Sequence, residues 1–275
     1  LIHNNDGTDL LANLWFGLMP ISVSDIEACV DMVAETPVST YMMCTGSEFV
    51  YYRSEYATML GDDRGGTRDC GTDSALFNSI NRYYRNILQL EEEGKDVVRV
   101  ALNRAKKRGM EAFVTYRMND LHFNDVKRPH SLLCADFWND HPEWWTMDAS
   151  QGYLSDGALD FAVKEVREHK KSIIFEQLDR YEMLDGFELD FMRFSVYFKG
   201  DGGRNHLEEM TQMVREIKGH ADSLGKLRGH PIMLAARVPI TLEACLDKGL
   251  DIRQWLHEGL LDFITIGVLW TGDTA

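Results

Sequence analysis

The sequence predicts an α/β fold of the (β/α)8 TIM-barrel type. Short apolar segments typical of buried strands alternate along the 275 residues with segments of helical periodicity, and this alternation indicates a parallel sheet. Connections that lead from a helix into a strand are short, whereas those that follow a strand are long. A barrel carries its site on the loops at the carboxyl ends of its strands, so this asymmetry favours a barrel. A doubly wound sheet, which binds ligands at the same end, is the alternative.

Six segments are predicted as strands. Each is short, rich in apolar or β-branched residues, and bounded by residues that favour turns. The run HNNDG marks the end of the first strand, and GFELDFMRF is the fourth. The predicted strands lie at 1–5, 39–46, 111–118, 186–192, 231–238 and 262–270.

Apolar residues at helical spacing fill the segments between these strands. Ser24 is followed three residues later by Glu27, a capping-box signature that predicts where the first helix begins. Gly109 ends the second helical region, which is interpreted as one helix or two. The predicted helical regions are 25–35, 78–109, 158–184, 205–226, 240–248 and 251–259.

The number of strands is smaller than a closed barrel needs. An eight-stranded barrel requires two strands more than the six found here. We therefore expect one barrel domain over residues 1–275 that is cut after its sixth unit, as the abrupt ending GVLWTGDTA also suggests. A sheet that closes in another way is the alternative.

Composition and charge narrow the range of partners. The chain carries 44 acidic and 29 basic residues and a formal charge of -15, which disfavours nucleic acid and anionic membrane surfaces as partners. No apolar run reaches the length of a membrane span. The five cysteines are scattered without metal-ligand spacing, and no GxGxxG follows a strand, so we expect free thiols and no cofactor.

The fourth strand carries two acids. Side chains alternate across a strand, so Phe187, Leu189 and Phe191 share one face while Glu188 and Asp190 share the other. The apolar face must meet the helices, which directs both carboxylates toward the barrel axis. Like charges this close raise at least one carboxyl pKa, and such a pair suits acid/base or nucleophilic catalysis. The alternative is that the two acids only pair with inward arginines and stabilise the barrel.

Arginines on two other predicted strands suit both a catalytic site and a pairing that only stabilises the barrel. Arg117 shares a face with Thr115 and Asn119, and Arg237 alternates with apolar neighbours. They are predicted to pair with the two acids or to bind substrate hydroxyls or carboxylates.

The long segment after the third strand combines polar and aromatic residues. Asp120 and His122 open it, and Trp138, Trp144, Trp145 and Tyr153 follow. Aromatic rings stack on the CH faces of sugars, while Asp, Asn and His bond sugar hydroxyls, so a carbohydrate ligand is expected. The alternative for each tryptophan is that it anchors the segment to the barrel rim.

A metal site built from Asp120, His122, Glu188 and Asp190 is a further possibility. The sequence contains no HxH or HExxH to select it, and no GxSxG elbow supports a serine nucleophile.

The succession RMND, HPEWW and ALDFAVKEVREHKKSIIFEQLDRYEMLDGFELDFMRF resembles the glycosyl-hydrolase-like family 10 group of predicted TIM-barrel glycosidases. The resemblance runs from about residue 5 to 268 and is specific over 111–198. It implies a glycosidase with site residues at Asn119, Asp120, Glu188, Asp190 and Arg193.

Two other glycosidase patterns are similar to the fourth strand. The DGFxxD strand of α-amylase-like enzymes implies that Asp190 is the nucleophile. The DxxDxDxE strand of family 18 chitinases matches Asp185, Glu188 and Asp190 but has Met192 where the acid should be, which argues against a chitinase mechanism. The acid is then expected from Asp120, from Asp273 or from a further unit.

The sequence therefore predicts a glycoside hydrolase that acts on an oligo- or polysaccharide. Asp190 and Glu188 are the predicted catalytic residues. The rivals are a non-catalytic carbohydrate-binding barrel and a metal-dependent lyase or isomerase. The predicted substrate-binding residues are Arg117, Asn119, Asp120, His122, Trp138, Trp144, Trp145, Arg193, Tyr197, Arg237 and Trp270.

Overall fold

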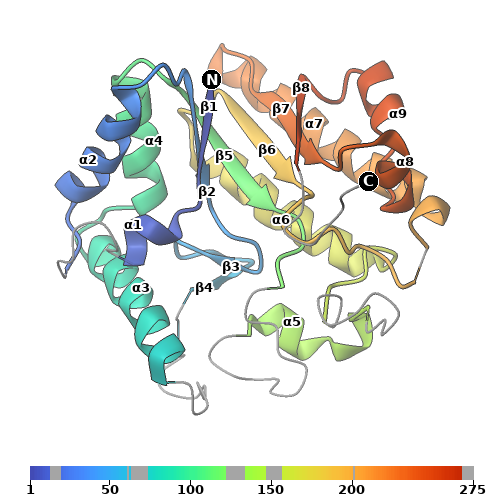
Figure 1. Cartoon of the computed structure of the whole chain (residues 1–275), viewed down its shortest axis with the longest axis horizontal. Helices are drawn as coiled ribbons and strands as arrows, with labels where there is room; N and C mark the ends of the chain where they lie inside the picture. The colour runs from blue at the N-terminus through green and yellow to red at the C-terminus, as the bar shows by residue number, and fades with distance from the viewer. Residues whose placement is uncertain are drawn as a thin grey trace.

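A parallel sheet of six strands forms the centre of the molecule, and its strands follow one another in chain order (Figure 1). The computed structural model describes residues 1–12, 20–60, 62, 74–121, 134–146, 157–200 and 202–267. Each strand falls within a predicted segment, so the α/β class and the parallel sheet are confirmed. The strands are β1 (Ile2–Asn5), β2 (Thr40–Cys44), β5 (Glu111–Arg117), β6 (Gly186–Asp190), β7 (Met233–Val238) and β8 (Phe263–Ile266).

Helices connect consecutive strands of this sheet. The predicted region 78–109 is two helices, because Gly94 with a φ of 70° ends the first and the side chain of Asp96 caps the second by accepting from the Arg99 N–H at 3.0 Å. The helices are α1 (Thr8–Ala12), α2 (Val23–Ala34), α3 (Ser74–Glu92), α4 (Val97–Lys107), α6 (Lys164–Arg180), α7 (Leu207–Arg228), α8 (Leu242–Asp247) and α9 (Ile252–His257).

The capping box of α2 lies two residues earlier than predicted. Ser22 is the N-cap, with its side chain accepting from the Asp25 N–H at 3.3 Å while the Asp25 carboxylate accepts from the Ser22 N–H at 2.8 Å. The prediction of Ser24 and Glu27 was wrong because the extended backbone that an N-cap requires falls at Ser22.

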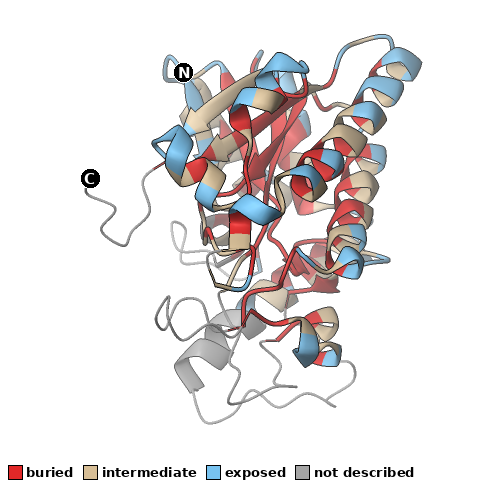
Figure 2. Ribbon diagram, turned by 90° about the vertical axis from the view of Figure 1, so that its right-hand side faces the viewer, coloured by how far each residue is buried: buried red, intermediate tan, exposed pale blue. Residues whose placement is uncertain are grey.

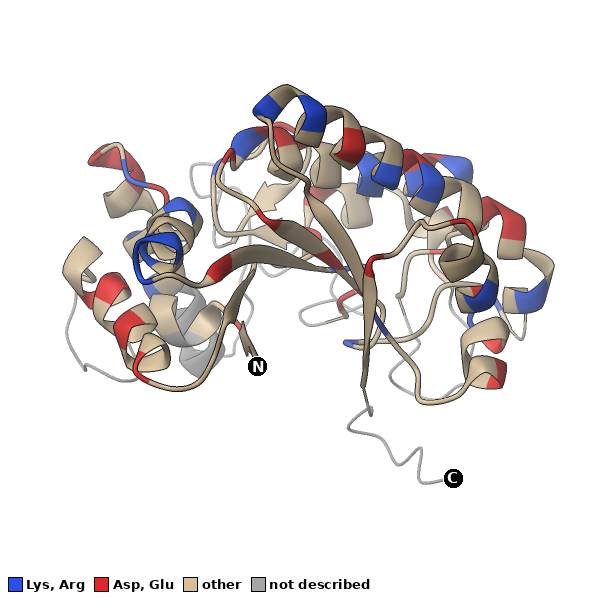
Figure 3. Ribbon diagram, turned by 90° about the horizontal axis from the view of Figure 1, so that it is seen from above, with Lys and Arg blue, Asp and Glu red and all other residues tan. Residues whose placement is uncertain are grey.

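The sheet is curled, and its convex side carries the helices (Figure 3). Viewed from above, the helices follow the outside of the curve and the strands line the inside. The six strands of this sheet form the wall of a half-barrel, which is consistent with the predicted TIM-type fold in which six β/α units are present.

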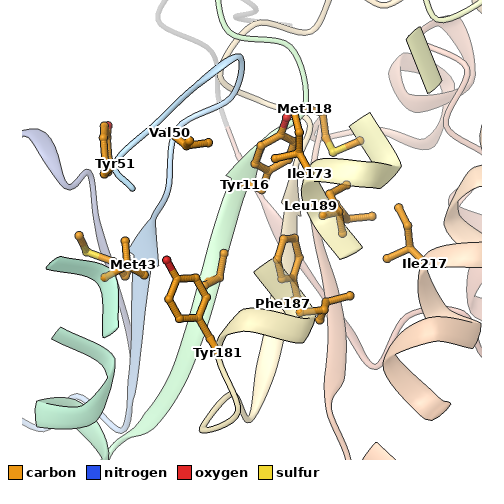
Figure 4. Packing of buried hydrophobic residues seen from close by; sticks show 14 of the residues in the cluster. Met43, Val50, Tyr51, Tyr116, Met118, Ile173, Tyr181, Phe187, Leu189 and Ile217 are labelled. Carbon is orange, nitrogen blue, oxygen red and sulfur yellow. The ribbon is translucent and has the colours of Figure 1, made fainter. Parts of the chain in front are cut away.

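The main core lies between the convex face and the helices. Met43, Tyr116, Phe187 and Leu189 leave the sheet on this side and belong, with Ile173 of α6, to a single buried cluster (Figure 4). Burial is concentrated on the strands and on the helix faces turned toward them (Figure 2). The apolar alternation of the sequence therefore predicts the helix-facing side of the sheet correctly.

The long segments that follow β2 and β5 contain short elements that the sequence did not predict. The first holds β3 (Phe49–Val50) and β4 (Thr58–Met59), and the second holds α5 (Asp136–Asp140) and a 3-10 turn over Pro142–Trp144. These elements have five residues or fewer, which is too short for periodicity to reveal. Among the described helices, none is both long enough and apolar enough to span a membrane.

Candidate active site

Strand register determines which side chains reach the concave face. Thr115, Glu188 and Ala235 are direct partners on β5, β6 and β7, and the next level toward the carboxyl ends is Arg117, Asp190 and Arg237. Paired residues of a parallel sheet point to the same side. Glu188 and Asp190 thus share the concave face, as predicted from their spacing.

Glu188 lies at the centre of the concave face and is 1% exposed. One carboxylate oxygen accepts from Thr115 Oγ1 at 2.8 Å and from Asn4 Nδ2 at 3.1 Å, and the other accepts from Thr265 Oγ1 at 2.8 Å. Burial raises the pKa of Glu188, and the nearby charge of Asp190 adds to this, while the threonine hydrogen bonds and Arg237 oppose it. Glu188 therefore connects β6 to β1, β5 and β8.

Asp190 lies one level closer to the carboxyl ends and is 4% exposed. Its Oδ1 accepts from the Met192 N–H at 2.8 Å, and its Oδ2 accepts from Arg237 Nη1 at 3.2 Å. Arg117 occupies the neighbouring position on β5, so Asp190 stands in register between two guanidinium-bearing residues. The predicted pairing of the acids with inward arginines is thus present for Asp190 and Arg237.

A cavity of about 210 Å³ opens beside Arg117, and neither Glu188 nor Asp190 lines it. Apart from Tyr83 of α3, its lining comes from the end of β5 and from the segments that follow β1, β2, β5 and β6, so it lies at the carboxyl ends of the strands. Arg117, Asp120 and Arg193 are the predicted residues that line it.

Arg117 bridges two carboxylates at this cavity. Its Nη1 donates to Asp120 Oδ2 at 2.8 Å, and its Nη2 pairs with Asp6 Oδ1. Asp6 also accepts from Thr8 Oγ1 at 2.9 Å. The three charged side chains therefore form one Asp–Arg–Asp bridge, in which Arg117 is 7% exposed.

A buried ion pair holds another side of the cavity in place. Glu48, in the segment after β2, pairs with Lys170 of α6, and its Oε2 lies 2.9 Å from His169 Nε2. Burial alone would raise the pKa of Glu48, but the charges of Lys170 and His169 outweigh it and lower the pKa to about 2. Lys170 also donates to Ser47 Oγ at 3.0 Å, so α6 anchors the loop after β2.

Because Gly7 and Gly46 have no Cβ, the Tyr51 ring and the Phe49 backbone can lie close to them at the cavity. Gly7 has a φ of 79°, and a Cβ there would lie 2.5 Å from the Tyr51 ring. Tyr51 Oη donates to the Asp6 carbonyl at 3.3 Å, which fixes the ring over the end of β1. Gly46 has a φ of 98°, and a Cβ there would lie 1.9 Å from the Phe49 carbonyl oxygen, so the turn after β2 also requires glycine.

Cys44 is a neighbour of both the cavity and β6. Cys44 is the register partner of Thr115 on the concave face. Burial raises the pKa of the Cys44 thiol to about 12, opposed by the Gly46 N–H, and the charges of Asp120 and Asp190 raise it further. Asp120 of the cavity and Asp190 of β6 are therefore both close enough to influence this buried thiol.

Several predicted substrate-binding residues are engaged elsewhere. Asn119 donates to the carbonyls of Leu159 at 3.0 Å and Val196 at 2.6 Å, and Tyr197 Oη donates to the Phe191 carbonyl at 2.9 Å. Both side chains are buried, and these bonds join loops to one another. Neither residue lines the cavity.

The tryptophans anchor the segment after β5. Trp138 and Trp145 are buried and stacked with ring centroids 4.0 Å apart, and Trp145 Nε1 donates to the Trp138 carbonyl at 2.9 Å. Trp144 is half-buried and stacks on His141 with centroids 3.6 Å apart. These contacts match the anchoring alternative, and none of the three lines the cavity. His122, Tyr153, Trp270 and Asp273 lie outside the described residues.

Asp6, Glu48 and Tyr51 were not selected from the sequence. Asp6 directly follows β1, and Glu48 follows β2 after three residues. Their placement just beyond strand ends was the available signal, because in a parallel barrel those positions face the site. Within the described ranges, no cluster of three or more His, Cys, Asp or Glu side chains has an arrangement that could hold a metal ion.

Comparisons with known proteins give no family assignment. No family model matches the chain, and no curated protein matches it. The resemblance to the glycosyl-hydrolase-like family 10 group therefore stays a prediction.

Solved structures with a partly similar chain fold include a chitinase, an α-amylase and a fucosidase. The chain is similar to chitinase ChiW from Paenibacillus sp., with 10% identity, a TM-score of 0.47, and coverage of 96% of this chain and 18% of that chain. It is similar to an α-amylase from Lactobacillus plantarum, with 11% identity, a TM-score of 0.47, and coverage of 96% and 52%. It is also similar to a GH29 α-L-fucosidase from Bacteroides thetaiotaomicron, with 12% identity, a TM-score of 0.39, and coverage of 76% and 33%. The chain thus spans at most about half the length of these three proteins.

Proposed function

We propose that this chain is a glycoside hydrolase that acts on an oligo- or polysaccharide, with Asp190 as its principal catalytic carboxylate. The observation that carries the proposal is the position of Asp190. It ends β6 on the concave face, in register between Arg117 and Arg237, at the strand ends where the cavity opens. Carboxylates and guanidinium groups that meet at the carboxyl end of a parallel half-barrel are suited to binding a sugar and hydrolysing its glycosidic bond.

Most glycoside hydrolases use two carboxyl groups to hydrolyse the glycosidic bond. Asp190 is assigned the first, as the nucleophile that attacks the anomeric carbon or as the base that activates water. The second function protonates the leaving oxygen. The sequence offers Asp120 and Asp273 for that step: Asp120 lines the cavity, where it accepts from Arg117, and Asp273 lies outside the described residues.

Glu188 is assigned an orienting role. Its two oxygens accept three hydrogen bonds from other strands, and the residue lies one level beneath Asp190 with 1% exposure. These contacts favour a substrate-orienting role for Glu188 over acid/base catalysis.

The test is reducing-sugar release from a broad panel of plant, algal and microbial polysaccharides. Asp190→Asn keeps the Oδ1 that accepts from Met192 and removes the carboxylate charge, so we expect it to fold and to lose turnover. Asp222→Asn on α7, whose carboxylate pairs with Lys218 at 3.1 Å, is the matched control and is expected to retain activity. Release that survives in Asp190→Asn would refute the residue assignment. Sugar binding without release would favour the non-catalytic barrel.

A further inference from the structure

The cavity at the strand ends combines an apolar wall with a charged floor. Phe49, Tyr51, Leu60 and Tyr83 contribute the apolar side, and the Asp–Arg–Asp bridge built on Arg117 contributes the polar side. Sugar rings present CH faces to aromatic groups and hydroxyls to carboxylates and guanidinium groups, so this combination suits a sugar.

The size of the cavity suits a small ligand. Its volume of about 210 Å³ is below the roughly 300 to 1,000 Å³ of pockets that hold drug-sized molecules. A single sugar ring is therefore the appropriate occupant.

The charges around the cavity are balanced. The lining contains three carboxylates, Asp6, Glu48 and Asp120, and two guanidinium groups, Arg117 and Arg193. The remaining positive charge comes from Lys170, which is buried and paired with Glu48. An anionic ligand needs a cation that carboxylates have not already neutralised. A cavity whose positive and negative charges are equal in number therefore favours an uncharged ligand.

We infer that this cavity is a subsite for one uncharged sugar ring, and that Asp6 excludes acidic sugars by neutralising Arg117. The inference rests on the proposed function and names the class of sugar that the site takes. Asp6 faces Arg117 from the segment after β1 and Asp120 faces it from the segment after β5, so both terminal nitrogens of the guanidinium already have carboxylate partners. A uronic acid would have to displace one of these carboxylates to reach Arg117.

Asp6 is the more accessible of the two partners of Arg117. Its side chain is 45% exposed, against 11% for Asp120. In Asp6→Asn, the side-chain oxygen still accepts from Thr8, while one side of Arg117 loses its negative partner. That side then becomes a binding position for a ligand carboxylate.

The experiment measures binding of matched sugar pairs by calorimetry or ligand-observed NMR. The probes are D-glucose with D-glucuronic acid, D-galactose with D-galacturonic acid, and D-mannose with D-mannuronic acid. We expect the wild-type protein to bind an uncharged member in preference to its acid. Asp6→Asn should shift that ratio toward the acid by about threefold to tenfold, the range for one partly exposed charge pair, and the shift should diminish at high salt.

Two further variants complete the design. Asp222→Asn removes a comparable paired carboxylate on α7 and should leave the ratio unchanged. Asp120→Asn releases the other side of Arg117 and should shift the ratio in the same direction, which keeps the test valid if Asp6→Asn fails to fold. The inference is overturned if the wild type prefers the uronic acids, if it binds none of the six sugars, or if neither variant changes the ratio.

The outcome is separable from that of the proposed function. A shifted ratio in a protein that releases no reducing sugar would support the subsite and refute the hydrolase. Reducing-sugar release with an unchanged ratio would support the hydrolase and refute the subsite.

Discussion

Glu188 on β6 accepts a hydrogen bond of 3.1 Å from Asn4 on β1, three places away in the order of the sheet. The same carboxylate accepts from Thr265 on β8, the strand at the opposite edge. One buried side chain thus reaches both edge strands, which is possible only because the sheet is curled. Glu188 helps to hold the curvature on which the position of Asp190 depends.

Glu188→Ala is expected to destabilise the protein by about 2 to 4 kcal/mol, because it removes buried volume and leaves buried hydroxyl and amide donors without their acceptor. Chemical denaturation measures this loss. Glu258→Ala, which removes a carboxylate that pairs with Arg215 on the surface, is the control and should cost about 1 kcal/mol or less. A loss as small as that of the control would show that Glu188 does not brace the sheet.

Glu188→Gln should change how stability depends on pH. Because the pKa of Glu188 is raised in the folded state, folding binds a proton there, so the wild type loses stability as pH rises from about 4.5 through the raised value. Glutamine cannot ionise and escapes this loss. The variant is therefore expected to gain stability relative to the wild type over that pH range, as followed by denaturation at a series of pH values. Parallel pH profiles for the two proteins would contradict the raised pKa.

Lys170→Met is expected to cost about 3 to 5 kcal/mol, because it leaves the buried Glu48 carboxylate without its main cation. Adding Glu48→Gln should recover much of the loss, since the double variant no longer buries an isolated charge. Thermal or chemical unfolding of the two single variants and the double variant gives the coupling energy. Additive effects would show that the pair is not coupled.

Glu48 should also contribute to acid sensitivity. Its pKa is lowered to about 2 from an ordinary value of 4.5, so its stabilisation is fully present above pH 4.5 and is lost as pH falls toward 2. A shift of this size corresponds to about 3 kcal/mol. The stability advantage of the wild type over Glu48→Gln should therefore shrink across that range, which acid titration of both proteins measures. An advantage that is constant from pH 5 to about 2 would refute this assignment.

Gly7→Ala should disturb the cavity and the fold together. The backbone of Gly7 has a φ of 79°, and the new Cβ would meet the Tyr51 ring at 2.5 Å. We expect a loss of about 1 to 3 kcal/mol, together with weaker sugar binding because the aromatic wall must move. Gly109→Ala is the control: its φ of 81° is similar, but a Cβ there would meet no atom within 4 Å, so sugar binding should be unaffected. Equal sugar affinity in both variants would show that Tyr51 is not part of the subsite.

Prediction from the sequence succeeded where the information is local. The alternation of Phe187, Glu188, Leu189 and Asp190 predicts which of them face the helices, and the structure buries Phe187 and Leu189 in the helix-facing core. It was less accurate where several local solutions compete, as at the start of α2, where Ser22 caps the helix and Ser24 does not. The tryptophans 138, 144 and 145 were ambiguous because aromatic rings suit both sugar contact and loop anchoring, and their packing matches anchoring.

The sequence by itself determined the order of strands and helices, the parallel sheet, and the direction in which Glu188 and Asp190 project. These properties follow from side-chain periodicity, which acts over a few residues. Only the tertiary structure decided that Arg117 pairs with both Asp6 and Asp120 and that Glu48 pairs with Lys170. Asp6 and Arg117 are more than a hundred residues apart in the sequence, and so are Glu48 and Lys170. Strand register and loop path bring such residues together, and neither leaves a pattern in the neighbouring sequence.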